Sequence, residues 1–253
     1  MITLEIANSV ATLTLRRPPV NAISDRVIEL FEERLDEINA RPDCKVVHVR
    51  SDQKVFCAGA DLTEVRQRFD APDGSERAYR FVSDLQQLYD RIERLPQVTL
   101  VEIAGAAVGG GLELALACDL RIIATDARVG LPEIGLGLIP AGGGTQRLTR
   151  LCGRAIAARL IFGAEIVVGA DAVQLGLAQW AAARDDITAI ASEIVHRIAT
   201  FPAAALRGCK KCIAAAGDSD GRGYATEREA TRRLSTHPET RERVAAFLAN
   251  HPR

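Results

Sequence analysis

Two spacings of apolar residues alternate along the first 130 positions of the chain. Every second residue is apolar in much of 2–6 and 10–15, which predicts two short strands joined by a turn. Apolar residues three or four positions apart follow Ser24 and recur across 75–95, which predicts two amphipathic helices. The remaining apolar runs predict strands at 46–50, 99–103 and 120–124, with a short apolar helix before the last of them.

Strands that alternate with helices in this way favour parallel crossover units and therefore an α/β body. From about 145 onward the pattern is almost wholly helical. The helices expected there are 153–163, 169–176, 185–200, 202–215, 222–235 and 238–249. A boundary near 185–200 would separate the α/β body from a helical tail.

Charge and composition narrow the possible partners. The chain has 253 residues, with 32 Lys and Arg against 33 Asp and Glu, so its formal charge is −1. Proteins that bind nucleic acid or a membrane surface usually carry a basic excess, so neither partner is expected. The longest weakly polar segments, 103–112 and 134–146, are too short for a membrane span. Residues 1–15 lack the continuous apolar stretch of a signal peptide, so a cytoplasmic location is expected.

Six cysteines and four histidines are scattered along the chain. Reduced thiols are the usual state of such cysteines. Cys209 and Cys212 have CxxC spacing, which is compatible with a zinc or redox role. No second pair and no nearby histidine accompany them, however, so we expect no metal site.

Three glycine-rich loops lie at 58–61, 109–111 and 142–144, and simple turns would explain each one alone. None of them forms a dinucleotide or phosphate-loop motif, and no serine lies in a GxSxG elbow. The second loop precedes an apolar helix at 112–118. The first-turn N–H groups of such a helix are unpaired and carry positive dipole character, so they can bind a developing oxyanion. A second N–H from Ala58 would complete an oxyanion hole.

Two isolated acids accompany these loops. Glu113 is the only charged residue between Glu102 and Asp119. Burial without a partner would raise its pKa, whereas an exposed position would only complement the helix dipole. Glu133 is similarly isolated in a loop, and a side chain that reaches solvent would explain it equally well. Two carboxylates in apolar surroundings beside an oxyanion hole would form an acid–base pair.

Four segments together resemble the crotonase superfamily. Phe56–Leu62 resembles its F-x-A-G-A-D-L segment, and the run GGGLELALACD that ends at Asp119 is similar to its second oxyanion-hole segment. Leu131–Arg147, with LPEI, IP and GGTQR, resembles its second catalytic segment. Arg17-Pro18 with Asn21-Ala22 is similar to an early loop that contacts coenzyme A. The similarity runs from about residue 10 to the C-terminus and is densest between 56 and 147.

The resemblance implies an α/β fold with a crotonase-like ββα-spiral catalytic core over 1–195 and a helical C-terminal region over 196–253 that serves oligomerisation. It implies a homotrimer or homohexamer. The implied substrate is an acyl-CoA thioester, and no separate cofactor is needed because coenzyme A is part of the substrate.

The resemblance also assigns roles to single residues. The N–H groups of Ala58 and Gly110 would bind the thioester oxygen, Glu113 would deprotonate water for attack at the β-carbon, and Glu133 would protonate the α-carbon. The substrate site would be lined by Ala22, Ala58, Gly59, Ala60, Asp61 and Gly110. Having both glutamates favours an enoyl-CoA hydratase, a hydro-lyase of the kind used in fatty-acid β-oxidation. An enoyl-CoA isomerase, a methylglutaconyl-CoA hydratase and a non-catalytic acyl-CoA-binding protein stay open.

Two departures from the superfamily pattern bear on the site. Relatives usually carry glycine after Ile-Pro, where this chain has Ala141, and a position that requires a positive φ would disfavour alanine. Many relatives also end in a segment like A-F-L-x-K-R. Here Ala246-Phe247-Leu248 is followed by no such lysine, so Arg253 or another cation would have to meet the phosphates of coenzyme A. Acyl-chain length and branching stay open.

Overall fold

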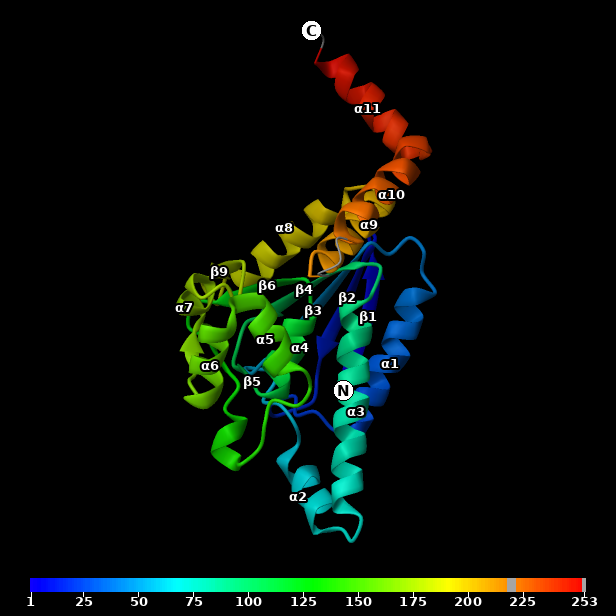
Figure 1. Cartoon of the computed structure of the whole chain (residues 1–253). Coiled ribbons are helices and arrows are strands. Elements are labelled where there is room, and N and C mark those ends of the chain that lie inside the picture. The colour runs from blue at the N-terminus through cyan, green and yellow to red at the C-terminus, as the bar shows by residue number, and fades with distance from the viewer. Residues whose placement is uncertain (218–221, 252–253) are drawn as a thin grey trace.

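The computed structural model describes residues 1–217 and 222–251, which form an α/β body followed by a helical tail (Figure 1). The strands are β1 (Ile2–Ala7), β2 (Val10–Leu15), β3 (Val46–Ser51), β4 (Val98–Ile103), β5 (Ala107–Val108), β6 (Leu120–Ala124), β7 (Arg128–Gly130), β8 (Val167–Val168) and β9 (Trp180–Ala182). The helices are α1 (Asp25–Asn39), α2 (Leu62–Asp70), α3 (Gly74–Glu93), α4 (Gly110–Ala117), α5 (Gly144–Cys152), α6 (Arg154–Phe162), α7 (Gly169–Gln174), α8 (Ile187–Ala199), α9 (Ala203–Ala215), α10 (Arg222–Thr236) and α11 (Pro238–Asn250), with a short 3-10 helix, η1 (Glu133–Leu136).

The main sheet has six strands in the order β1-β2-β3-β4-β6-β9. Only β1 and β2 are antiparallel, and every later neighbour is parallel, as the alternation of strands and helices predicted. A second sheet joins β5, β7 and β8. Because β3 and β4 are parallel neighbours, the loops that follow them leave the same edge of the sheet. These loops contain the first two glycine-rich segments.

The predicted helices on the first half of the chain form as their apolar spacing indicated. The side chain of Ser24 accepts a hydrogen bond from the N–H of Val27 and so caps the start of α1. Helix α4 is buried along its whole length, which agrees with its lack of a polar face. Helix α8 covers the sheet, and a buried polar contact fixes it there: Thr188 donates to Glu102 at 2.6 Å, and Glu102 lies 3.0 Å from His48.

Several elements are absent from the sequence prediction. Strands β8 and β9 interrupt the region that was expected to be wholly helical, and the short strands β5 and β7 were not expected. Helix α2 was also missed. None of the helices in the described part of the chain has the length and apolarity that a membrane crossing requires.

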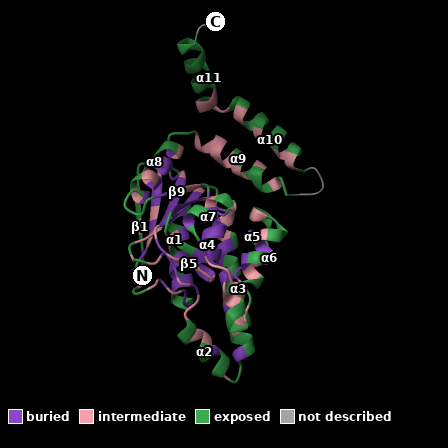
Figure 2. Cartoon of the chain, turned by 90° about the vertical axis from the view of Figure 1, so that its left-hand side faces the viewer, coloured by how far each residue is buried: buried purple, intermediate pink, exposed green. Residues whose placement is uncertain are grey.

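The helical tail begins after α8 rather than within it. The predicted boundary between 195 and 196 falls inside α8, whose buried residues continue to Ala199. Helices α9, α10 and α11 have no buried residue among those described, and α11 points away from the body (Figure 2). The division into two domains stays a prediction.

Candidate active site

A cavity of about 700 Å³ lies where the loops after β3 and β4 meet helices α2 and α3 and the loop around η1. Most of its lining is apolar. Its charged lining residues are Arg68, Glu113 and Glu133. The structure therefore brings both isolated acids to one cavity, and neither points into bulk solvent as the alternative interpretations had allowed.

The first two glycine-rich loops contact each other main chain to main chain. Gly59 and Gly109 both have positive φ, at 88° and 54°. A Cβ atom on Gly59 would lie 3.0 Å from the carbonyl oxygen of Val108 and 3.1 Å from the nitrogen of Gly110. Only glycine allows both this conformation and this approach. The contact places the start of α4 directly against the segment 58–61.

The structure revises the expected pair of oxyanion donors. The N–H of Ala58 already donates to the carbonyl of Val20 at 3.0 Å, so it is not free to bind a substrate. The flanking residues Gly59 and Asp61 pair with Ile23, which turns the N–H of Ala60 in the opposite direction. That nitrogen lies 3.6 Å from the position of a Cβ on Gly110.

The N–H groups of Ala60 and Gly110 share one further property. Within the described residues, neither of them has a hydrogen-bond acceptor. Gly110 is the first residue of α4, so its N–H lies outside the helical hydrogen bonds. Ala60 was expected to line the site but not to supply a donor. The available donors are thus the N–H groups of Ala60 and Gly110, because the N–H of Ala58 is already paired with Val20.

Glu113 lies in the first turn of α4 and is almost completely buried. The pKa of this carboxyl group is raised from 4.5 to about 7, mainly by burial and to a smaller extent by the nearby charge of Glu133. The N–H of Gly144 donates to Oε1 of Glu113 at 2.8 Å and opposes this rise. Glycine is required at 144, because a Cβ there would lie 2.8 Å from the same oxygen. The third glycine-rich loop therefore holds Glu113.

Glu133 begins η1 and lines the same cavity. Its Oε1 lies 3.1 Å from the position of a Cβ on Gly109. Its Oε2 is buried and has no hydrogen-bond partner within the described part of the protein. Burial raises the pKa of this carboxyl group as well. An unpaired buried carboxyl oxygen favours the protonated form of the acid.

The raised pKa of Glu113 predicts a pH-dependent cost in stability. The unfolded chain releases this proton near pH 4.5 and the folded protein near pH 7, so stability falls as the pH rises through this window. A Glu113→Gln variant does not titrate there. We expect its free energy of unfolding, relative to wild type, to increase by about 2.5 kcal/mol between pH 5 and pH 8. Urea denaturation at both pH values measures this change, and parallel pH dependence of the two proteins would contradict it.

The early loop and the segment 58–61 are joined by one arginine. Arg17 donates to the carbonyl of Ala22 at 2.7 Å and to the carboxylate of Asp61 at 2.6 Å. The hydrogen bond from Arg17 lowers the pKa of Asp61. Asp61 also caps α2 by accepting from Thr63. Ala22 and Asp61 are thus brought together, although neither lines the cavity.

The two departures from the superfamily pattern have different outcomes. Ala141 lines the cavity without a positive φ, so alanine fits there without backbone strain, and its carbonyl accepts from Gln86 at 2.6 Å. Arg253 lies outside the described residues.

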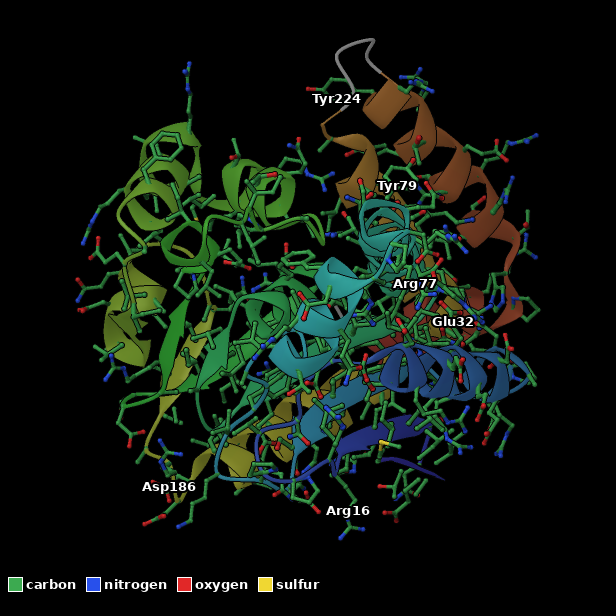
Figure 3. All side chains as sticks on the ribbon, turned by 90° about the horizontal axis from the view of Figure 1, so that it is seen from below. Arg16, Glu32, Arg77, Tyr79, Asp186 and Tyr224 are labelled. Carbon is green, nitrogen blue, oxygen red and sulfur yellow. The ribbon has the colours of Figure 1, made fainter. Side chains whose placement is uncertain are left out.

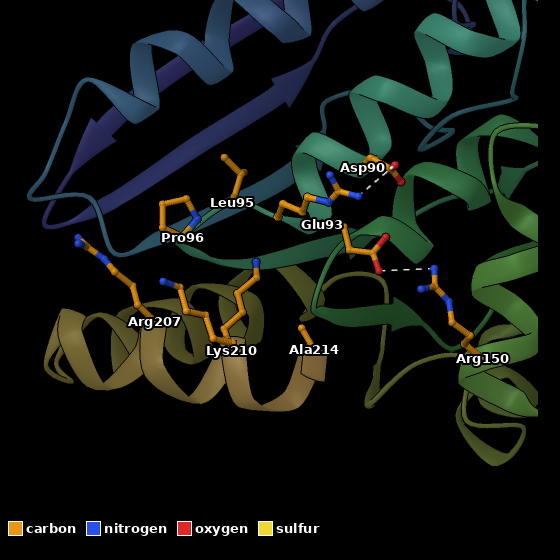
Figure 4. Close-up of a pocket in the computed structure, with 10 residues that line it drawn as sticks. Asp90, Glu93, Leu95, Pro96, Arg150, Arg207, Lys210 and Ala214 are labelled. Carbon is orange, nitrogen blue, oxygen red and sulfur yellow. Dashed lines mark ion pairs between the residues drawn. The ribbon is translucent and has the colours of Figure 1, made fainter. Parts of the chain in front are cut away.

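A second cavity, of about 490 Å³, lies between the end of α3, α5 and α9 (Figure 4). It is lined by both signs of charge, with ion pairs between Asp90 and Arg94 and between Glu93 and Arg150. Cys209 and Cys212 lie on the same helix α9 as Lys210. No cluster with metal-binding potential occurs among the described residues. The CxxC spacing here is a feature of a helix in which no residue is fully buried.

Comparison with known proteins identifies the family of this chain. A sequence model of the enoyl-CoA hydratase/isomerase family matches residues 5–251. The chain belongs to this family. It is 42% identical to a probable enoyl-CoA hydratase of Bacillus subtilis over 176 aligned residues. The aligned region covers 70% of this chain and 67% of that protein.

Other relatives in the enoyl-CoA hydratase/isomerase family match a larger share of this chain's length. It is 36% identical over 241 residues to the putative enoyl-CoA hydratase/isomerase YngF of Bacillus subtilis, across 94% of this chain and 90% of the relative. The crystal structure of an enoyl-CoA hydratase from Bacillus anthracis superposes with a TM-score of 0.92 at 32% identity, covering 98% of this chain and 96% of the other. The predicted crotonase fold and superfamily are thereby confirmed.

Proposed function

We propose that this protein catalyses the reversible syn addition of water to a 2-enoyl-CoA thioester. One observation carries the proposal: the buried Glu113 and the partly buried Glu133 face the same cavity as two unpaired main-chain N–H groups. The N–H groups of Ala60 and Gly110 would bind the thioester oxygen, where negative charge grows when water attacks the β-carbon. They replace the pair of Ala58 and Gly110 that the sequence suggested.

The surroundings of the two acids support different roles. Glu113 accepts a main-chain hydrogen bond, which favours its ionised form and suits a group that removes a proton from water. Glu133 has a buried oxygen without a donor, which favours its protonated form and suits a group that gives a proton to the α-carbon. The water proton passes to Glu113, the proton of Glu133 passes to the α-carbon, and the hydroxyl joins the β-carbon. After the product leaves, Glu113 loses a proton to solvent and Glu133 takes one up, which returns both acids to their starting states.

An assay with crotonyl-CoA tests the proposal. We expect the absorbance of the conjugated enoyl thioester to fall to an equilibrium value, with 3-hydroxybutyryl-CoA as the product. A reaction that only converts a 3-enoyl-CoA into a 2-enoyl-CoA would identify an isomerase instead. Binding of crotonyl-CoA without turnover would identify a non-catalytic acyl-CoA-binding protein. Either result would contradict hydration of this substrate class.

Assembly into a trimer or hexamer is part of the same proposal. Val244, Phe247 and Leu248 are exposed on α11, which extends from the body. Apolar side chains grouped on an extended helix favour contact with another chain. Burial of this surface between copies of the protein would explain why no residue of α9–α11 is buried within the described part of a single chain.

A further inference from the structure

The wall of the cavity formed by α2 and α3 contains a buried cation. Of the described residues that line the cavity, only Arg68 is positively charged. It lies near the end of α2 and is 8% exposed. Its guanidinium carbon lies 4.1 Å from the centre of the Phe81 ring on α3. A wall that had only to hold a hydrocarbon chain would not require a charged group at this place.

The known partners of Arg68 satisfy only one side of its guanidinium. Nη2 lies 2.8 Å from Asp25 and 2.9 Å from Glu64, and both of these acids reach solvent. Nη1 is buried and has no acceptor within the described residues. A buried donor of a charged group that lacks an acceptor is destabilising. Nη1 of Arg68 therefore lacks an acceptor, and the side chain that carries it borders the cavity.

The spacing of Phe81 and Leu85 along α3 indicates how far Arg68 lies from the two acids. A Cβ on Gly142 would lie 3.1 Å from Leu85 and 2.6 Å from Oε2 of Glu113, so Leu85 marks the level of the acid–base pair. Phe81, which contacts Arg68, precedes Leu85 by one helical turn, which is about 6 Å along the axis. Figure 3 looks onto this end of the molecule, where α2 lies beside the first turns of α3 that carry Arg77 and Tyr79.

We infer that Arg68 binds a carboxylate at the far end of the acyl chain, so that the preferred substrates are thioesters of short dicarboxylic acids. This inference rests on the proposed function for the identity of the thioester, and it adds the chemistry of the other end. Among the described residues that line the cavity, Arg68 is the only cation that can bind this carboxylate. A guanidinium in apolar surroundings binds a carboxylate more strongly than it would in water.

Binding of saturated analogues tests this inference without any reaction. Adipyl-CoA ends in a carboxylate, and hexanoyl-CoA has the same chain length and ends in a methyl group. We expect calorimetric titration of the full-length protein to show about 10- to 100-fold tighter binding of adipyl-CoA. Arg68→Met is expected to bring the ratio of the two dissociation constants close to one. Arg68→Lys keeps the charge and is expected to retain part of the preference.

Arg66→Met is the matched control for loss of an arginine from α2. Arg66 lies on the same helix, pairs with Asp70 at the surface and does not line the cavity, so its loss should leave the ratio unchanged. Equal binding of the two thioesters by wild type would overturn the inference, and so would a preference that survives in Arg68→Met. If Arg68→Met fails to fold, the wild-type ratio and Arg68→Lys still decide the matter. Failure of crotonyl-CoA hydration leaves these binding ratios intact, so the two proposals fail separately.

Discussion

Replacing Glu113 or Glu133 by glutamine is expected to slow hydration of a 2-enoyl-CoA by about 10²- to 10⁴-fold in each variant. Glutamine has the size of glutamate but does not exchange a proton. At position 113 its amide oxygen can still accept the N–H of Gly144, so the third glycine-rich loop should keep its place. At position 133 it fills the same buried space. The loss should therefore appear in kcat rather than in the folding of the protein.

Steady-state kinetics with crotonyl-CoA, together with circular dichroism of each variant, measures this effect. Glu165→Gln is a suitable control, because Glu165 pairs with Arg159 at the surface and does not line the cavity. That control should turn over at the wild-type rate. Turnover close to wild type in either Glu113→Gln or Glu133→Gln would remove the corresponding residue from the mechanism.

The second large effect concerns the main-chain donor at the start of α4. Gly110→Pro is expected to lower kcat/KM by about 10²- to 10³-fold relative to Gly110→Ala. Proline lacks the N–H that would bind the thioester oxygen. The first residue of a helix tolerates proline, because its N–H has no partner within the helix. A Cβ at position 110 would meet Cδ1 of Ile23 at 3.1 Å, and this end of a flexible side chain can move aside.

The comparison of proline with alanine separates the effect of the added Cβ from the loss of the N–H. Both variants carry the Cβ, whereas only proline replaces the N–H by a ring carbon that cannot donate. Kinetics of both proteins and their thermal melting temperatures should be measured together. Equal kcat/KM values for two folded variants would show that the N–H of Gly110 does not stabilise the transition state.

Apolar spacing predicted most of the body of the fold but missed its short elements. Strands β5, β7 and β8 have only two or three residues, which is too few for a period to appear. Helix α2 was missed for a different reason. Its apolar residues Leu62, Val65 and Phe69 do recur at helical spacing, but the helix has only nine residues and these side chains line the cavity instead of packing in the core. So short a pattern does not stand out from the surrounding loop.

The site residues, too, could be predicted only in part from the sequence. Isolation among apolar neighbours was enough to single out Glu113, and its burial is confirmed. The donor assigned to Ala58 was wrong, because the bridge between Ile23 and Ala60 decides which way each N–H points. The residue types 58–61 are compatible with either direction. The contribution of Gly144 was not foreseen either, since the loop that carries it lies 31 positions beyond Glu113.

The contact between Gly59 and Gly109 has a consequence for how this scaffold can diverge. The two peptide segments touch without side chains between them, so no change of rotamer can alter the spacing of the adjoining amides. Adaptation to a new acyl group therefore has to use the side chains that α2, α3, η1 and the loop after η1 contribute to the cavity. The architecture separates a fixed reaction centre from an adjustable recognition wall, and changes in one need not disturb the other.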